Sequence, residues 1–162
     1  MWDERYSSKE YIYGEAPNEF FREKIDNLSE LLPADGEGRN SVYAALNGWT
    51  VDAFDQSHQA YLKAMRLAEK YGVHINYYEL DFENVGKQFR PNSYDLIVLT
   101  YAHLPVSLEK KIEYHRHLII LLKAGGQIIL EGFSKEQRAY QIENSKAGGP
   151  RDENMLYSED EI

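Results

Sequence analysis

Short apolar segments alternate with helical patterns along most of the chain. The continuous apolar run from Tyr94 to Thr100 is typical of a strand that is buried on both faces of a parallel sheet. Further strands are predicted at residues 28–33, 49–54, 74–80 and 127–132. Helices are predicted at 39–46, from Ser57 to Gly72 and from Ser107 to Leu122. This order predicts an α/β fold with a doubly wound, mostly parallel sheet and helices on both faces.

The two ends of the chain depart from this alternation. The first residues combine charges with aromatic side chains, and Pro17-Asn18 precedes a helical pattern, so we expect an aromatic and helical cover there. After Gly132 the sequence is polar, and we expect a mobile loop or lid over 144–155. The predicted organisation is a single domain, 1–162, with a cover at 1–25, a core at 28–132 and a polar lid or tail at 133–162.

The composition narrows the class of partner. The 27 acidic and 18 basic residues give a net charge of −9, which argues against nucleic acid or an anionic membrane as partner. The chain has no cysteine, so disulfides, thiolate nucleophiles and cysteine zinc sites are excluded. No apolar run approaches the length of a membrane span, and residues 1–5 are too polar for a signal peptide. We therefore expect a cytoplasmic protein that acts on a small-molecule substrate.

A glycine turn after the first predicted strand and an acid at the end of the second indicate a nucleoside site. Gly36 and Gly38 let the backbone approach a ligand closely, and Asp55 can accept two hydrogen bonds from a ribose diol. The alternative for Asp55 is a cap on the following helix. Asp35 and Glu37 flank Gly36, and their charges disfavour a diphosphate and favour a cationic ligand such as a sulfonium with its α-amino group.

Several segments together resemble the class I S-adenosylmethionine-dependent methyltransferases, most closely their tellurite-resistance (TehB-like) branch. The segments, in family order, are WDERY at 2–6, GEGRNSVYAA at 36–45, LNGWTVDAFD at 46–55, YDLIVLT at 94–100 and LKAGGQIIL at 122–130. The resemblance implies a Rossmann-like methyltransferase sheet that binds S-adenosylmethionine. Family sheets ordinarily end with two further antiparallel strands, which we do not find after residue 132. We therefore expect either that the sequence is a fragment or that the strand at 127–132 forms an exposed edge that supports a homo-oligomer.

The candidate cofactor-binding residues follow the predicted strands. The resemblance places Asp81 at the adenine amine and Phe82 against the base, while the alternative for Asp81 is a solvated strand end. Arg39 either pairs with Glu37 or reaches the cofactor carboxylate, and its alternative, like that of Asn40, is surface or cap chemistry. The full predicted set is Tyr13, Asp35, Gly36, Gly38, Arg39, Asn40, Phe54, Asp55, Gln56, Asp81, Phe82 and Tyr101.

No catalytic base stands out. The candidates for contact with substrate are His103, Tyr101 and Tyr6, although a lone loop histidine is more often structural. We expect no metal site, since His115 and His117 lie two apart on a helix and cannot share a face. Soft anionic nucleophiles need no general base, which favours an acceptor of the thiol, selenite or tellurite type.

Two alternatives remain open beside a small-molecule methyltransferase. The first is a non-catalytic or degenerate nucleoside- or S-adenosylmethionine-binding protein. It is favoured by Leu32 and Ala34, which stand where the family motif has an acid and a glycine. The second is a nicotinamide oxidoreductase, which is disfavoured because Ser41 occupies the third glycine position of the dinucleotide fingerprint.

Overall fold

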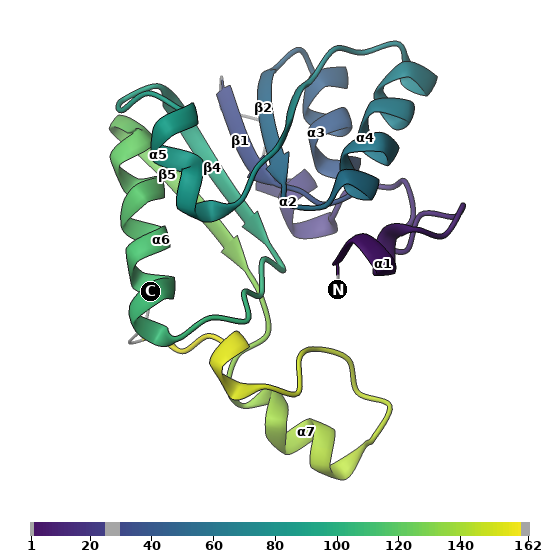
Figure 1. The fold of residues 1–162 in the computed structure, drawn as a ribbon, viewed down its shortest axis with the longest axis vertical. Coiled ribbons are helices and arrows are strands. Elements are labelled where there is room, and N and C mark those ends of the chain that lie inside the picture. The colour runs from purple at the N-terminus through teal and green to yellow at the C-terminus, as the bar shows by residue number, and fades with distance from the viewer. Residues whose placement is uncertain (1, 25–29, 160–162) are drawn as a thin grey trace.

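Five parallel strands form one sheet in the computed structural model, which describes residues 2–24 and 30–159. The strands are β1 (Glu30–Ala34), β2 (Thr50–Asp55), β3 (Asn76–Glu79), β4 (Tyr94–Thr100) and β5 (Leu122–Glu131). They follow the order β3-β2-β1-β4-β5, and every pairing is parallel, so the predicted doubly wound sheet is confirmed. The order reverses between β1 and β4, whose carboxyl ends therefore flank the crevice where α/β proteins bind ligands (Figure 1).

Helices cover both faces of the sheet, as expected (Figure 1). They are α3 (Arg39–Leu46) and α4 (His58–Tyr71) on one face, and α5 (Val85–Gln88) and α6 (Leu108–Leu121) on the other. Val42 and Leu67 pack in one core with Leu96, whereas Leu118 packs in a second core with Ile97. Leu96 and Ile97 are consecutive in β4 and point to opposite faces, which explains the uninterrupted apolar run in this strand.

The predicted N-caps of the two long helices and the glycine at the end of α4 are confirmed. The Ser57 hydroxyl accepts a hydrogen bond from the Ala60 amide at 3.2 Å, and Gly72 ends α4 with a φ of 66°. The Ser107 hydroxyl accepts from the Lys110 amide at 3.4 Å and caps α6 in the same way. These ends follow from local chemistry, which is why the sequence alone locates them.

Most strand boundaries differ from the prediction by one or two residues, and the start of β5 differs by more. β1 is described from Glu30 onward, and residues 28–29 lie outside the described residues. β3 begins two residues later than expected, at Asn76. β5 begins at Leu122 instead of Gln127, because Leu122 is already extended as α6 ends and pairs with Tyr94. The ladder then shifts register, so the expected turn at Gly125-Gly126 is an irregularity within the strand.

The N-terminal segment forms two short helices, α1 (Trp2–Tyr6) and α2 (Glu19–Lys24). The helix expected after Pro17-Asn18 is therefore present. The Asp3 carboxylate accepts hydrogen bonds from the Ser57 hydroxyl at 2.8 Å and from the Gln59 amide at 2.9 Å. These bonds fix α1 against the first turn of α4, at the carboxyl end of the sheet (Figure 1).

The C-terminal segment is more ordered than its polar sequence suggests. It contains α7 (Gln137–Glu143) and a 3₁₀ turn (Glu153–Met155), neither of which the sequence pattern predicts. Leu156 and Tyr157 are buried. The Lys111 ammonium donates to the Leu156 carbonyl at 2.8 Å, and the Tyr157 hydroxyl donates to the Ala102 carbonyl at 2.7 Å. Much of the loop expected at 144–155 is irregular, but it is anchored by the residues that follow it, and its mobility stays a prediction.

The outer edge of β5 pairs with no strand of the described residues. An isolated bridge between Ser134 and Tyr157 lies beyond the end of the strand. Ile128 on β5 is 38% exposed. The expected homo-oligomer through this edge stays a prediction. No helix in the described part of the chain has the length and apolar character needed to cross a membrane.

Candidate functional site

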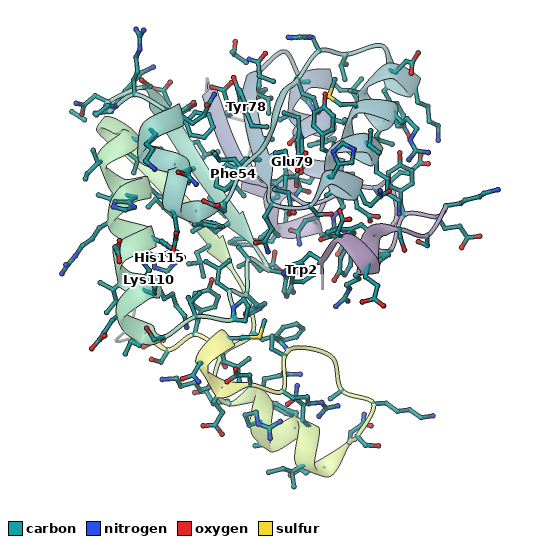
Figure 2. The ribbon with its side chains drawn as sticks, in the orientation of Figure 1. Trp2, Phe54, Tyr78, Glu79, Lys110 and His115 are labelled. Atoms are coloured by element: carbon teal, nitrogen blue, oxygen red, sulfur yellow. The ribbon has the colours of Figure 1, made fainter. Side chains whose placement is uncertain are left out.

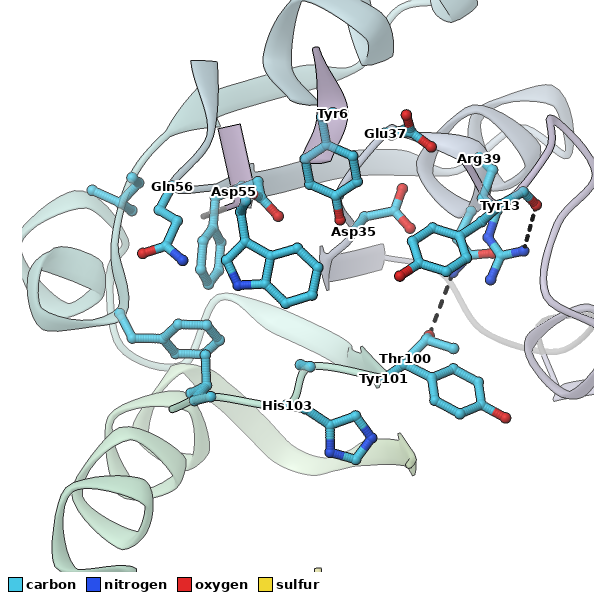
Figure 3. A pocket seen from close by; sticks show the side chains of 18 residues that line it. Tyr6, Tyr13, Asp35, Glu37, Arg39, Asp55, Gln56, Thr100, Tyr101 and His103 are labelled. Atoms are coloured by element: carbon cyan, nitrogen blue, oxygen red, sulfur yellow. Dashed lines mark hydrogen bonds between the residues drawn. The ribbon is translucent and has the colours of Figure 1, made fainter. Parts of the chain in front are cut away.

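A cavity of about 120 Å³ lies at the carboxyl end of the sheet. Gly36 follows β1, Asp55 ends β2 and Thr100 ends β4, and all three line the cavity (Figure 3). Most of the residues predicted to bind a cofactor are in its wall: Tyr13, Asp35, Gly36, Arg39, Asn40, Phe54, Asp55, Gln56, Phe82 and Tyr101. Two of the predicted residues, Gly38 and Asp81, are not.

The two glycines of the turn have different roles. Gly36 has a φ of 58°, and a Cβ there would lie 2.8 Å from the Tyr6 hydroxyl, so only glycine permits this approach at the cavity wall. The Gly36 carbonyl also accepts a hydrogen bond from Tyr77. A Cβ on Gly38 would instead lie 2.6 Å from the Ala64 Cβ. Gly38 therefore allows α3 and α4 to pack closely, and its predicted place at the ligand is not what the geometry shows.

Two partly buried carboxyl groups line the cavity, Asp35 directly after β1 and Asp55 at the end of β2. Burial raises the pKa of Asp55 to about 6, although its Oδ1 accepts a hydrogen bond from the Ser57 amide at 2.8 Å. Burial likewise raises the pKa of Asp35 to about 6, while its Oδ2 accepts from the Ser41 amide and hydroxyl at 2.9 and 2.7 Å. The Tyr6 hydroxyl points toward both carboxyl groups in Figure 3. Two acids at one cavity favour a ligand that donates hydrogen bonds or carries positive charge.

The charge of Glu37 is neutralised inside the protein. Its Oε1 lies 2.6 Å from the Lys63 ammonium, and both side chains are at most 3% exposed. Its Oε2 accepts from the Ile12 amide at 2.8 Å. The expectation that Glu37 adds negative charge for a cationic ligand is therefore wrong, and so is its pairing with Arg39. The Arg39 guanidinium donates to the Tyr13 carbonyl at 3.1 Å and lies over the Tyr13 ring (Figure 3).

An apolar slot opens beside Asp55, next to the end of β3. Leu80, Phe82 and Phe54 line it, with the two phenyl rings edge to face at a centroid distance of 5.1 Å. Asp81 is exposed, and its Oδ1 accepts hydrogen bonds from the Asn84 amide at 3.0 Å and side chain at 2.8 Å. Asp81 thus caps the 3₁₀ turn that follows it, which agrees with the solvated strand end given above as its alternative.

His103 is buried and both of its ring nitrogens are engaged. Nε2 accepts a hydrogen bond from the Phe133 amide at 3.0 Å, so Nδ1 carries the proton and donates to the Met155 carbonyl at 2.6 Å. Burial lowers the pKa of His103, which favours this neutral form. The side chain joins the loop after β4 to the C-terminal segment, and the geometry favours a structural role over that of a base.

The two tyrosines named as catalytic candidates both line the cavity. Tyr101 has a φ of 56°, a strained value for a residue with a side chain, and its hydroxyl donates to the Glu131 carboxylate at 2.9 Å. Burial and this carboxylate raise the pKa of Tyr101. Burial and the Asp55 charge raise the pKa of Tyr6. Both hydroxyl groups are therefore protonated at neutral pH and can only donate or accept hydrogen bonds there.

Residues 33–126, more than half of the chain, match the family model described as a methyltransferase domain. The chain belongs to this methyltransferase-domain family. No curated protein sequence matches the chain significantly.

Solved structures resemble this methyltransferase domain in fold. TehB from Haemophilus influenzae is 23% identical over 82% of this chain and 46% of its own, with a TM-score of 0.64. A SAM-dependent methyltransferase from Aquifex aeolicus is 18% identical over 91% of this chain and 76% of its own, with a TM-score of 0.62. Magnesium protoporphyrin IX methyltransferase from Synechocystis PCC 6803 with bound SAH is 16% identical over 86% of this chain and 62% of its own, with a TM-score of 0.61. The domain thus spans less than two thirds of the first and third of these proteins.

The wall of the methyltransferase cavity also contains residues outside the predicted set: Trp2, Glu37, Leu80, Thr100, Ala102 and Leu104. Thr100 and Ala102 could have been found from their position directly after β4. Apart from the high aromatic content of the first residues, the sequence does not indicate that Trp2 lines the cavity, because only the packing of α1 on α4 brings it there. Figure 2 shows Trp2 near the carboxyl end of the sheet. Phe54, which also lines the cavity, belongs to β2.

Proposed function

We propose that this methyltransferase domain binds S-adenosylmethionine in the cavity and transfers its methyl group to a small soluble acceptor. The partly buried Asp55 carboxylate in the cavity wall is the observation that carries the proposal. It ends β2, the strand next to β1, beside the close backbone approach at Gly36 and on the same edge of the sheet as the crevice between β1 and β4. A ribose diol supplies the two hydroxyl donors that such a carboxylate accepts.

The other wall residues fit the remaining parts of the same cofactor. The slot formed by Phe54, Leu80 and Phe82 has the apolar surfaces that an adenine ring requires. Asp35 and Asp55 provide negative charge for the sulfonium and the α-amino group. Arg39 also lines the cavity and suits the cofactor carboxylate.

When bound, S-adenosylmethionine supplies an electrophilic methyl group. A lone pair of the acceptor forms the new bond to the methyl carbon, while the carbon–sulfur bond breaks and its electrons remain on sulfur, giving S-adenosylhomocysteine. The protein contributes alignment and the exclusion of water. His103 has no free nitrogen for proton removal. We therefore infer an acceptor that is already a soft or ionised nucleophile, of the thiol, selenite or tellurite type expected from the sequence.

Calorimetric titration with S-adenosylmethionine, S-adenosylhomocysteine and NAD tests the cofactor assignment. We expect the first two to bind and NAD not to bind. Asp55→Ala should weaken binding by about 1–3 kcal/mol, the cost of leaving polar partners unpaired. Asp81→Ala is the matched control, because this acid also follows a strand but lies outside the cavity wall, and it should leave affinity unchanged. Equal affinities for wild-type protein and Asp55→Ala would refute the assignment.

A cofactor-binding domain without catalysis is the second candidate. The departures Leu32 and Ala34 in the first motif favour it. It predicts binding of S-adenosylmethionine without production of S-adenosylhomocysteine in the presence of thiols, selenite or tellurite. Within the family, the likeness to TehB supports a relation to the tellurite-resistance branch, which turnover of tellurite would test.

A further inference from the structure

A second cavity, of about 420 Å³, adjoins the proposed cofactor site. Trp2, Tyr13, Tyr101 and His103 line both cavities, so these four side chains stand where the two spaces meet. Arg5, Phe133 and residues of the C-terminal segment also line the new space. For direct transfer, an acceptor in the second cavity would present its nucleophilic atom between these side chains, in contact with the methyl carbon of a cofactor in the first.

We propose that the second cavity binds the methyl acceptor and that the acceptor is a flat, aromatic organic anion. This inference rests on the proposed function, because the second cavity can serve as an acceptor site only if the methyl donor binds in the first. The evidence comes from the rings of the wall, from its single cationic side chain and from its size.

Aromatic rings dominate the wall. The Phe133 ring lies 5.1 Å from the Tyr101 ring and 5.6 Å from the His103 ring between centroids, and Trp2 and Tyr13 face the same space from the N-terminal segment. Gly149 packs directly on Phe133, since a Cβ there would lie 2.9 Å from the phenyl ring. A flat aromatic ligand gains stacking and edge contacts from such walls, whereas a hydrated inorganic oxyanion gains nothing from them.

Arg5 gives the cavity its only formal charge among the described residues that line it. The guanidinium lies over the Trp2 ring at 5.3 Å and over the Tyr13 ring at 5.4 Å. His103 adds no charge, because it is held neutral by the contacts of both nitrogens. A positive, acid-free cavity in a chain of net charge −9 selects an anion, and a stacked guanidinium presents its N–H edge to a carboxylate.

The size of the space points the same way. A space of about 420 Å³ is much larger than a selenite or tellurite ion. Selenite and tellurite would leave most of it empty. The acceptor is therefore an organic molecule whose nucleophilic atom is separate from the anionic group held by Arg5.

The probe that combines these features is 4-mercaptobenzoate, an aromatic thiol with a carboxylate. Its thiolate sulfur can form the bond to the methyl carbon while the cofactor sulfur takes the electron pair, with no proton transferred to the protein. Matched probes remove one feature each. They are 4-mercaptobenzamide, which lacks the carboxylate charge, 3-mercaptopropionate, which lacks the aromatic ring, and selenite, which has no organic group.

Each probe is titrated calorimetrically into the protein alone and into the protein with saturating S-adenosylhomocysteine. We expect 4-mercaptobenzoate to bind at least about tenfold more tightly than each of the other three, and Arg5→Gln to weaken it about tenfold, the loss expected for one charge-assisted contact. The affinity of the amide should not change in this variant. Arg90→Gln is the matched control, because Arg90 is exposed and lies before β4, away from both cavities.

The outcomes separate this inference from the proposed function. Equal binding of benzoate and amide, tighter binding of selenite or mercaptopropionate, or an equal effect of Arg5→Gln on both aromatic probes would overturn it. Failure of S-adenosylhomocysteine to bind would refute the proposed function, whereas the titrations without cofactor would still decide whether the second cavity selects an aromatic anion. Arg5 is exposed, so Arg5→Gln should fold like the wild type, which a thermal melt checks.

Discussion

The buried pair of Lys63 and Glu37 makes a strong prediction about stability. Lys63→Met keeps an apolar side chain of similar length in α4 but removes the ammonium. Of its contacts with the described residues given above, the Glu37 carboxylate, 3% exposed, then keeps the hydrogen bond from Ile12, and the Glu10 carbonyl loses the Lys63 donor. Removing one member of a buried ion pair costs about 3–5 kcal/mol, because the remaining charge is buried and uncompensated. For a domain of this size that corresponds to a Tm lower by roughly 6–20 °C.

Urea denaturation at pH 7, followed by circular dichroism, measures the effect. Lys63→Met combined with Glu37→Leu should recover most of the loss, since no charge then remains buried. Lys70→Met is the matched control on the same helix, because Lys70 pairs with Glu15 at the surface, and it should have little effect. If Lys63→Met and Lys70→Met changed stability equally, or if the double substitution were no better than the single one, the reasoning would be refuted.

Four further predictions follow from the described contacts. Gly38→Ala should lower the unfolding free energy by about 1–3 kcal/mol more than Gly48→Ala, because both glycines have positive φ but only a Cβ on Gly38 would clash with Ala64. Equal losses of the two variants in urea denaturation would contradict the packing role of Gly38. Because burial raises the folded-state pKa of Asp55 from 3.8 to about 6, the folded protein binds this proton more tightly, and its unfolding free energy should fall as pH rises from about 4 to 6, by up to about 3 kcal/mol. Asp55→Asn should remove this part of the fall in the cofactor-free protein, and an unchanged slope would count against it. S-adenosylhomocysteine should protect residues 1–15 from limited proteolysis, since Trp2, Tyr6 and Tyr13 line the first cavity; equal cleavage with and without ligand would exclude a cover that orders on binding. Self-association through the β5 edge should appear in sedimentation velocity and be lost in Ile128→Lys, whereas a wild-type monomer at high concentration would show that the edge is protected.

The parts of the fold that the sequence predicts are those whose causes are local. The apolar run of β4 and the caps Ser57 and Gly72 each act within a few residues, so their effects can be inferred without a structure. The glycine turn followed by Asp55 likewise places a cavity, because the carboxyl ends of parallel strands share one edge of the sheet.

The features that were missed depend on distant partners. Lys63 lies among the apolar positions of α4, and nothing in the sequence pattern links it to Glu37, which is 26 residues away. The packing role of Gly38 requires the position of Ala64, which only the crossing of two helices determines. The polar C-terminal segment contains Leu156 and Tyr157, and two adjacent apolar residues are too short a pattern to predict burial. Asp81 follows a strand as Asp55 does, and only its contact with Asn84 distinguishes the two.

Two buried lysines anchor the ends of the chain by the same chemistry. Lys63 in α4 donates to the carbonyl of Glu10, and Lys111 in α6 donates to the carbonyl of Leu156. A main-chain carbonyl is present at every residue, so these anchors do not require a particular side chain in the terminal segments. The side chains that form the second cavity, such as Arg5 and Phe133, can therefore be exchanged while the anchors persist. Under the proposal that the second cavity binds the acceptor, a scaffold of this kind would let substrate preference evolve, or be redesigned, without rebuilding the attachment of the segments that line it.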